Sequence, residues 1–420
     1  MTQLALRYGG RSLDLDYDET RFRVLAPEEH ARHPLSDAEI GAAIDAPIGS
    51  PPLEEIISAG ESVLLIVSDA TRATASAQLV HLLVRRLIAL GVAPSDIQII
   101  FATGIHRAVT PEEKRELLTP FIVRRIKTLD HNASDEKQLI RLGQTERGTP
   151  VELNRALKEH THVILTGAVG FHYFAGFTGG RKSICPGLAS ARTIEATHML
   201  ALDFERGGRR AGVGAGLLEG NPVHEECERI AALVAPSFLV NALVDEHGRA
   251  ARLYAGDWRE AHALACLEYQ QEHSVRLEAK REVVIVGGGG APWDINLIQA
   301  HKALEMAAQA VSEGGTIILV AECAEGLGRA DFLKWFDAVN SRALENNLRE
   351  RYEVTGQTAW SLLLKAERFR IFLISSLAPE DVQKMRMTPA RTIEEALVQT
   401  GGAAEGYIMP RGAAVLPLIV

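Results

Sequence analysis

Cysteine is scarce and scattered in this sequence, with four residues in a chain of 420. No two of them form a Cys-x-x-Cys pair, which argues against a thiolate zinc site. Widely spaced cysteines are typical of a reducing compartment, so we expect a cytoplasmic protein. The four residues are Cys185, Cys227, Cys266 and Cys323.

The sequence also lacks an excess of basic residues and has no long apolar run. Acids outnumber bases 54 to 45, giving a net charge of −9, which argues against a nucleic-acid-binding surface spread over the molecule. No run approaches the ~20 apolar residues that cross a bilayer. The first ten residues show no basic region followed by an apolar one, so no signal peptide is predicted. We expect neither a nucleic acid nor a membrane as partner.

What remains is the composition of an ordinary globular protein, 46% hydrophobic and 24% charged. Short alternating strands are predicted in the first 30 residues. Buried apolar runs follow at 63–67, 97–102 and 162–167. Segments with helical spacing separate them, such as Ala75–Leu90, for which Thr74 is the predicted N-cap. Strands that alternate with helices indicate parallel sheets covered by helices.

The same alternation restarts after a charged helical stretch at 258–281, with the stretch EVVIVGGGG at 282–290, in which a glycine run follows a strand, and a helix near 296–312. We therefore predict two α/β domains with mainly parallel sheets, residues 1–280 and 281–420. The active site is expected in the cleft between them.

Polar clusters follow the three buried runs of the first half. In open parallel sheets, ligands bind beyond the carboxyl ends of the strands, so these clusters are expected to meet in one crevice. They hold two histidines, three arginines and a lysine in addition to turn-forming residues, which favours a ligand site over ordinary capped loops. The clusters are Ser68–Arg72, Thr103–Arg107, and Gly170–His172 with Ala175–Ser183.

Two glycine-rich stretches invite comparison with nucleotide-binding motifs. GFTGGRKS is not a P-loop, because Arg181 stands where that motif needs glycine. Its backbone amides could still hold a phosphate beside Arg181 or Lys182. The run at 287–290 lacks the third small residue of a dinucleotide fingerprint, and we predict a tight turn there.

Spacing alone leaves two further features open. His198 shares a helical face with apolar residues, which is typical of a core histidine, although the same geometry could present a lone metal ligand. Gln299 and Lys302 lie three apart on a predicted helix. They suit a carboxylate ligand as well as they suit a solvated face.

Taken together, these motifs resemble the nickel-dependent lactate racemase family, whose members use a nickel-pincer nucleotide to racemise or epimerise 2-hydroxy acids. Each motif is weak alone, but the ordered set spans most of the chain. The matching residues are Asp69-Ala70-Thr71-Arg72, Gly104-Ile105-His106-Arg107, Gly170-Phe171-His172, Ala175–Ser183, Pro186-Gly187, His198, Gln299 and Lys302.

The resemblance implies a role for each matching residue. His106 and His172 correspond to the paired acid/base histidines, His198 to the nickel ligand, and Lys182 to the lysine that can bind the cofactor covalently. Other residues expected around the cofactor are Asp69, Thr71, Gly179, Gly180 and Trp360. Those expected around the substrate are Arg72, Tyr173, Gln299 and Lys302. The resemblance also implies cofactor-synthesis proteins as partners.

The chemistry is consistent with that assignment. Removing the α-hydrogen of a 2-hydroxy acid as a proton would build charge beside a carboxylate, whereas its removal as hydride leaves a neutral 2-oxo acid. No side chain accepts hydride, so a cofactor is required, and histidine is suited to taking and returning the hydroxyl proton. Two alternatives stay open. One is a metal-dependent hydrolase of a small anionic substrate, with Asp69, His106 and His172 as ligands. The other is a sugar-acid-binding protein.

Overall fold

The computed structural model describes residues 2–27, 33–401 and 405–420. They form two compact units, each assembled from separate stretches of chain. We call residues 33–201 and 211–269 the central unit. The C-terminal unit comprises residues 2–27, Leu202–Arg210 and 270–420, apart from the three undescribed positions.

The central unit is built on a six-stranded sheet in the order β13-β12-β9-β4-β5-β6. All neighbouring strands are parallel except β12 and β13, which pair antiparallel. The strands are β4 (Val63–Ser68), β5 (Ile97–Ala102), β6 (Lys127–Asp130), β9 (His162–Ala168), β12 (Phe238–Val244) and β13 (Ala250–Gly256).

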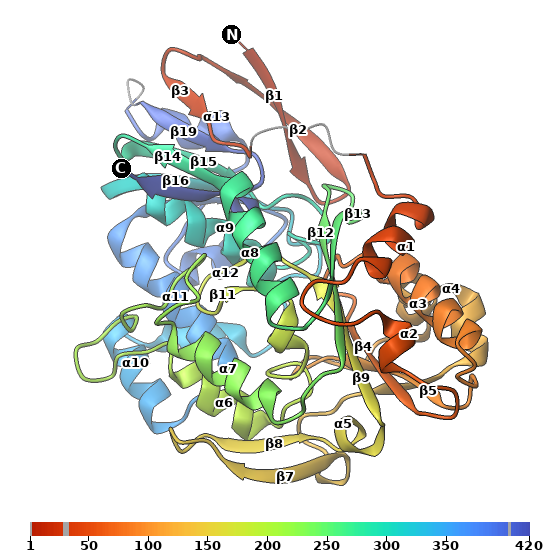
Figure 1. Ribbon diagram of the computed structural model, residues 1–420. Coiled ribbons are helices and arrows are strands. Elements are labelled where there is room, and N and C mark those ends of the chain that lie inside the picture. Colours follow the sequence, from red (N-terminus) through yellow and green to blue (C-terminus); the bar gives the residue numbers. More distant parts are fainter. Residues whose placement is uncertain (1, 28–32, 402–404) are drawn as a thin grey trace. The chain divides into compact units, whose positions relative to one another are not determined.

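The sequence explains the middle of this sheet directly. Residues 63–67 are fully buried, as expected for a parallel strand covered on both faces. Helices α3 (Ser76–Ala89) and α4 (Pro111–Arg125) contact one another beside β4 and β5 (Figure 1). Apolar residues of both helices pack into the core of this unit.

Shorter elements complete the central unit. β7 (Leu139–Gln144) pairs with β8 (Pro150–Asn154), and β10 (Phe171–His172) pairs with β11 (Gly176–Phe177), both antiparallel. The 3-10 helix η2 (Gly180–Ser183) follows β11. The remaining helices are α1 (Asp37–Asp45), α2 (Leu53–Ile56), α5 (Ala156–Glu159), α6 (Ala191–Met199), α7 (Pro222–Ala232) and α8 (Glu260–His273), which runs on into the C-terminal unit.

The C-terminal unit has its own six-stranded sheet, entirely parallel, in the order β18-β17-β16-β15-β19-β3. Two further strand pairs lie outside it, the antiparallel pair β1 (Thr2–Tyr8) and β2 (Arg11–Tyr17) and the parallel pair β14 (Ser274–Leu277) and β20 (Leu416–Ile419). The sheet strands are β3 (Phe22–Val24), β15 (Arg281–Gly287), β16 (Val311–Val320), β17 (Arg370–Ile374), β18 (Thr388–Pro389) and β19 (Gly406–Met409).

Among the helices of this unit, α9 (Leu297–Ala310) contacts β15 and β16, and α11 (Val354–Arg368) contacts β16 and β17. The others are α10 (Ser341–Glu350), α12 (Pro379–Lys384) and α13 (Ile393–Val398). Within the described residues, no helix combines the length and the apolar character needed to span a membrane.

The predicted α/β class with mainly parallel sheets is confirmed. The compact units, however, do not follow a single division of the chain near residue 280. The C-terminal unit also takes in the first strands, because β3 adds to its sheet beside β19 and Leu6, Leu15 and Phe22 join its core.

One local prediction is wrong. Thr74 does not cap α3, because the N-cap residue is Ala75, in a left-handed conformation with φ of 53°. The Thr74 hydroxyl instead forms a hydrogen bond of 2.6 Å with the hydroxyl of Ser76.

Candidate active site

The crevice predicted from the sequence corresponds to the point where the strand order of the central sheet reverses. From β4 the chain adds β5 on one side and β9 on the other. Loops that leave neighbouring strands in opposite directions open a gap at the carboxyl edge of a sheet. The three polar clusters follow these three strands. The structure brings them together. His106 contacts Asp69, the Gly104 N–H donates to the Gly187 carbonyl, and the Gly187 N–H donates to the carbonyl of Lys182 in the third cluster.

Asp69 and His106 form the best-defined pair of the site. Nδ1 of His106 lies 2.7 Å from Oδ2 of Asp69, whose other oxygen accepts from the Thr71 hydroxyl at 2.6 Å and the Thr71 N–H at 3.1 Å. Burial acts to raise the pKa of Asp69. The hydrogen bond and charge of His106, the charge of Arg72 and the hydrogen bond from Thr71 outweigh it and lower that pKa to about 2. Asp69 is therefore an ionised acceptor at neutral pH.

His172 and Lys182 face each other on the third loop. The short β10–β11 turn places Nδ1 of His172 at 3.2 Å from the Ala175 N–H, and Nε2 lies 3.4 Å from Nζ of Lys182. Burial, with the charges of Arg181 and Arg72, lowers the pKa of Lys182 to about 7, against a smaller opposing effect of Cys227. A substantial fraction of Lys182 is therefore an uncharged amine near neutrality. Tyr173 stacks on the His172 ring, with centroids 5.4 Å apart.

His198 is the residue best suited to hold a metal. It lies on α6, is 6% exposed, and neither of its ring nitrogens has a hydrogen-bond partner in the described part of the chain. Burial and the charge of Lys182 lower its pKa to about 3, so the ring is neutral. Neutral imidazole is the ligand form of histidine, and a buried polar atom without a partner is costly unless something binds it. The Phe174 ring makes edge contacts with both histidine rings, with centroids 4.5 Å apart for His172 and 4.9 Å apart for His198.

Gly179 and Gly180 of the third loop lie so close to other side chains of the protein that a Cβ atom would clash with them. A Cβ at Gly179 would lie 2.6 Å from Oδ1 of Asn241, and one at Gly180 would lie 2.6 Å from the His262 ring. The Gly180 N–H already donates to Asn241 at 2.9 Å. That amide is therefore occupied, and cofactor binding by Gly179 and Gly180 stays a prediction.

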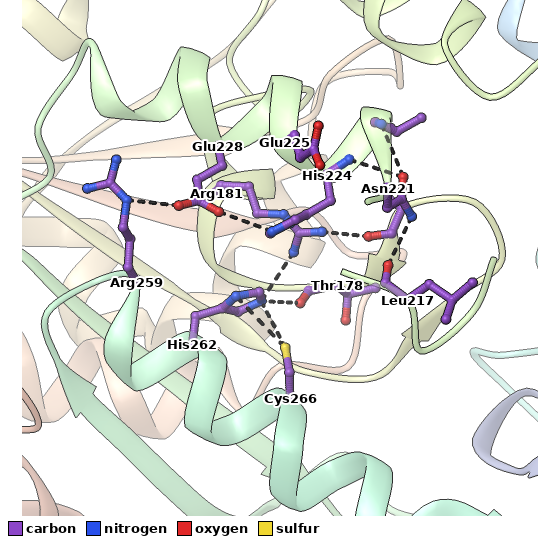
Figure 2. Close-up of polar contacts among 12 residues, drawn as sticks. Thr178, Arg181, Leu217, Asn221, His224, Glu225, Glu228, Arg259, His262 and Cys266 are labelled. Carbon is purple, nitrogen blue, oxygen red and sulfur yellow. Dashed lines mark hydrogen bonds and ion pairs between the residues drawn. The ribbon is translucent and has the colours of Figure 1, made fainter. Parts of the chain in front are cut away.

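Arg181 is buried and bonded to protein atoms, so it is not available as an exposed phosphate ligand. It is 1% exposed, and its Nη2 donates to the Ala175 carbonyl at 2.6 Å while Nη1 lies 3.2 Å from Nε2 of His262. Figure 2 shows Arg181 directed toward His262, which in turn contacts Cys266 and the Thr178 carbonyl. Sequence reasoning missed Asn241 and His262. Neither stands in a recognisable motif, and only the fold brings them to this loop.

The other predicted site residues belong to the C-terminal unit. Gln299 and Lys302 lie one turn apart on α9, and Nζ of Lys302 donates to Oε1 of Gln299. Trp360 lies on α11 and is 2% exposed. The roles of all three residues stay predictions.

Two neighbours of these residues serve the fold. Asn296 caps α9 by accepting from the Gln299 N–H. Asp294 accepts from the backbone N–H groups of Gly9 and Glu322. The glycine run before them ends β15, with φ of +103° at Gly289 and +75° at Gly290. The turn lies just after the predicted position, at residues 291–294, where the Asp294 N–H donates to the Gly290 carbonyl.

In the residues that the structure describes, no group of three or more His, Cys, Asp or Glu side chains is arranged to hold a metal ion. The nickel site predicted from the resemblance requires one protein ligand, so this finding does not test it.

Comparison with known proteins identifies the class. The chain matches the family model of the lactate racemase N-terminal domain over residues 8–208 and that of the C-terminal domain over residues 277–416. The fold and these matches define a racemase, which is an isomerase acting on a small molecule. The chain belongs to the lactate racemase family.

Individual relatives support this assignment over almost the whole chain. A lactate racemase from Lactiplantibacillus plantarum is 30% identical, covering 99% of this chain and 100% of the relative. One from Thermoanaerobacterium thermosaccharolyticum is 28% identical and covers 94% of both chains.

Solved structures agree. The lactate racemase apoprotein of T. thermosaccharolyticum superposes with a TM-score of 0.90 at 26% identity, covering 99% of this chain and 100% of that one. A Thermotoga maritima protein shares the fold at 17% identity, with a TM-score of 0.71 over 93% of this chain and 100% of its own. The predicted enzyme class, a racemase, is confirmed, and the hydrolase and binding-protein alternatives gain no support.

Proposed function

We propose that this protein racemises or epimerises 2-hydroxy acids with a nickel-pincer nucleotide as cofactor. Lactate is the first candidate substrate, because both curated relatives are lactate racemases. The observation that carries the cofactor assignment is the neutral imidazole of His198, which is buried near the amine of Lys182 and has no hydrogen-bond partner among the described residues. A metal bound through one protein nitrogen would satisfy that imidazole.

The cofactor would be held mainly by the central unit. His198 supplies the ligand to nickel and Lys182 the attachment point, with Asp69, Thr71, Gly179, Gly180 and Trp360 completing its surroundings. When bound, the cofactor supplies an acceptor for the hydride of the substrate α-carbon, which makes a 2-oxo acid the intermediate.

The chain's own residues handle the substrate and its proton. Arg72 can hold a carboxylate through two hydrogen bonds, and Gln299, Lys302 and Tyr173 complete the proposed substrate contacts. Nε2 of His106 takes the hydroxyl proton as the α-hydrogen leaves. The charge of Asp69 then stabilises the imidazolium through Nδ1.

A labelled substrate tests the reaction. The protein should be produced together with cofactor-synthesis proteins and supplied with α-deuterated L-lactate in ordinary water. We expect D-lactate that retains deuterium, together with about one nickel per chain by elemental analysis. Complete exchange of the label with solvent would contradict hydride transfer and indicate deprotonation of the α-carbon.

His198→Ala provides the matched test of the metal ligand. The variant should lose nickel and racemase activity together. His172→Ala should keep nickel while losing activity, since its side chain is proposed to act on the substrate. Wild-type nickel content and turnover in His198→Ala would contradict the ligand assignment.

A further inference from the structure

The two histidines proposed to act on the substrate differ in the group that contacts Nδ1. In His106 that group is the carboxylate of Asp69, at 2.7 Å. In His172 it is the backbone N–H of Ala175, at 3.2 Å. An ionised carboxylate can only accept a hydrogen bond, whereas a backbone N–H can only donate one.

These contacts fix where each neutral ring carries its proton. Beside the Asp69 carboxylate, His106 must carry its proton on Nδ1, which leaves the lone pair of Nε2 bare. Beside the Ala175 N–H, His172 must present a bare Nδ1, so its proton is on Nε2, on the side that faces Lys182 at 3.4 Å.

We propose that the two histidines are held in opposite tautomers and are therefore unequal partners in the reaction. His106 is ready to accept the hydroxyl proton of the substrate, and Asp69 is its positioning residue. His172 enters as an N–H donor to a substrate oxygen. It can accept a proton only after its contact with Ala175 is broken. This inference deepens the proposed function and takes its catalytic meaning from it.

The surroundings of each histidine hold its arrangement in place. Thr71 donates twice to Oδ1 of Asp69, which leaves Oδ2 for His106. On the other loop, the buried Arg181 donates to the Ala175 carbonyl at 2.6 Å. His262, contacted by Arg181, packs against Gly180. Arg181 thus joins the glycine loop to Ala175, six positions earlier, and holds that residue in place. The Ala175 N–H in turn sets the tautomer of His172.

The Thr71 contacts also determine what Asp69→Asn would do. The Thr71 N–H can only donate, so the amide oxygen of asparagine is retained at the Oδ1 position. Its NH₂ group must then face Nδ1 of His106 and donate to it. That contact forces the proton of His106 onto Nε2 and removes the bare nitrogen needed to accept the substrate proton. A catalytic histidine held in the wrong tautomer in this way loses about 10⁴-fold in turnover.

The tautomers can be measured directly by NMR on the full-length protein labelled with ¹⁵N-histidine. The chain has 14 histidines, so each signal is assigned by its disappearance in His106→Gln or His172→Gln. Long-range ¹H–¹⁵N correlations should show the Nδ1–H form for His106 and the Nε2–H form for His172. Finding the same tautomer at both positions would overturn the proposal.

Two variants extend the test. Asp69→Asn should switch the His106 pattern to Nε2–H, whereas Thr71→Ser, which keeps both donors, should leave it at Nδ1–H. An unchanged His106 pattern in Asp69→Asn would contradict the positioning role of Asp69. Because these spectra need no cofactor or turnover, they separate this proposal from the proposed function. A protein with opposite tautomers but no racemase activity would contradict the proposed function alone.

Discussion

Each unit buries a lysine side chain, but only the lysine of the C-terminal unit is paired with a carboxylate within the described residues. In the C-terminal unit, Lys365 is 6% exposed, and its Nζ lies 2.5 Å from Oε1 of Glu305, which Arg209 also contacts at 3.0 Å. In the central unit, Lys182 lies close to His172 and above the ring of Phe174, without an ion pair to any acid in the described ranges.

This difference indicates that Lys365 stabilises the fold, whereas Lys182 belongs to a ligand site. A buried lysine paired with a carboxylate satisfies both charges and holds α9 to α11. A lysine without an acid, near His198, whose ring nitrogens have no hydrogen-bond partner among the described residues, destabilises the empty protein. Such a cluster is expected where an anionic or metal-containing ligand completes the site. Three substitutions test this comparison.

The largest effect is expected from Glu305→Ala, which leaves the charge of Lys365 buried and uncompensated. Removing one partner of a buried ion pair typically costs about 3–5 kcal/mol. Urea unfolding followed by circular dichroism measures the loss. Glu313→Ala is the control, because Glu313 forms an exposed pair with Arg368 and should leave the unfolding free energy nearly unchanged. Equal losses in the two variants would show that the buried ion pair stabilises the fold no more than the exposed one.

A smaller effect is expected from Lys182→Met in the cofactor-free protein. The pKa of Lys182 falls from its usual 10.5 to about 7 on folding, so the unfolded chain binds more protons than the folded one between these values. The wild-type protein should therefore gain stability from this residue as pH rises from about 7 to 10.5, and the variant should lack that gain. The slope of unfolding free energy against pH should fall by at most ~1.4 kcal/mol per pH unit.

Urea unfolding at pH 7, 8 and 9 measures that slope. Lys158→Met is the control, because Lys158 is exposed and its Nζ donates to the Leu233 carbonyl at 2.9 Å. An identical slope in wild-type protein and Lys182→Met would show that Lys182 is charged in the folded state, like an exposed lysine.

The smallest effect on stability is expected from His198→Leu. Its ring nitrogens have no hydrogen-bond partner in the described chain, so an apolar replacement of similar size should change the unfolding free energy of the empty protein by less than about 1 kcal/mol. His131→Leu is the contrast, because both nitrogens of His131 are bonded, to the Ala189 carbonyl and the Asn154 amide. It should cost about 1–3 kcal/mol more, and a comparable loss in His198→Leu would point to a structural role.

The sequence predicts the elements around the site better than the contacts within it. The mainly apolar runs of β4, β5 and β9 are visible without a structure, because a strand covered on both faces has no regular polar alternation. The polar residues that follow these runs therefore predict one site. The bond between Asp69 and His106 cannot be predicted in this way, since it depends on β5 lying beside β4.

Other features have no local signal at all. The capping of α3 depends on a left-handed Ala75, a conformation that alanine rarely adopts. His262 and Asn241 reach the glycine loop from α8 and β12, more than 50 residues further along the chain. Likewise, no pattern in Phe22–Val24 indicates that this strand pairs with Gly406–Met409.

That last pairing bears on how the protein is made. A ribosome delivers β3 long before β19, so β3 must wait for its neighbour while the whole central unit emerges. Contacts so distant in sequence close slowly. The central unit can therefore form its sheet before the C-terminal sheet is complete, and until β19 emerges the unpaired strands of that sheet are exposed to aggregation.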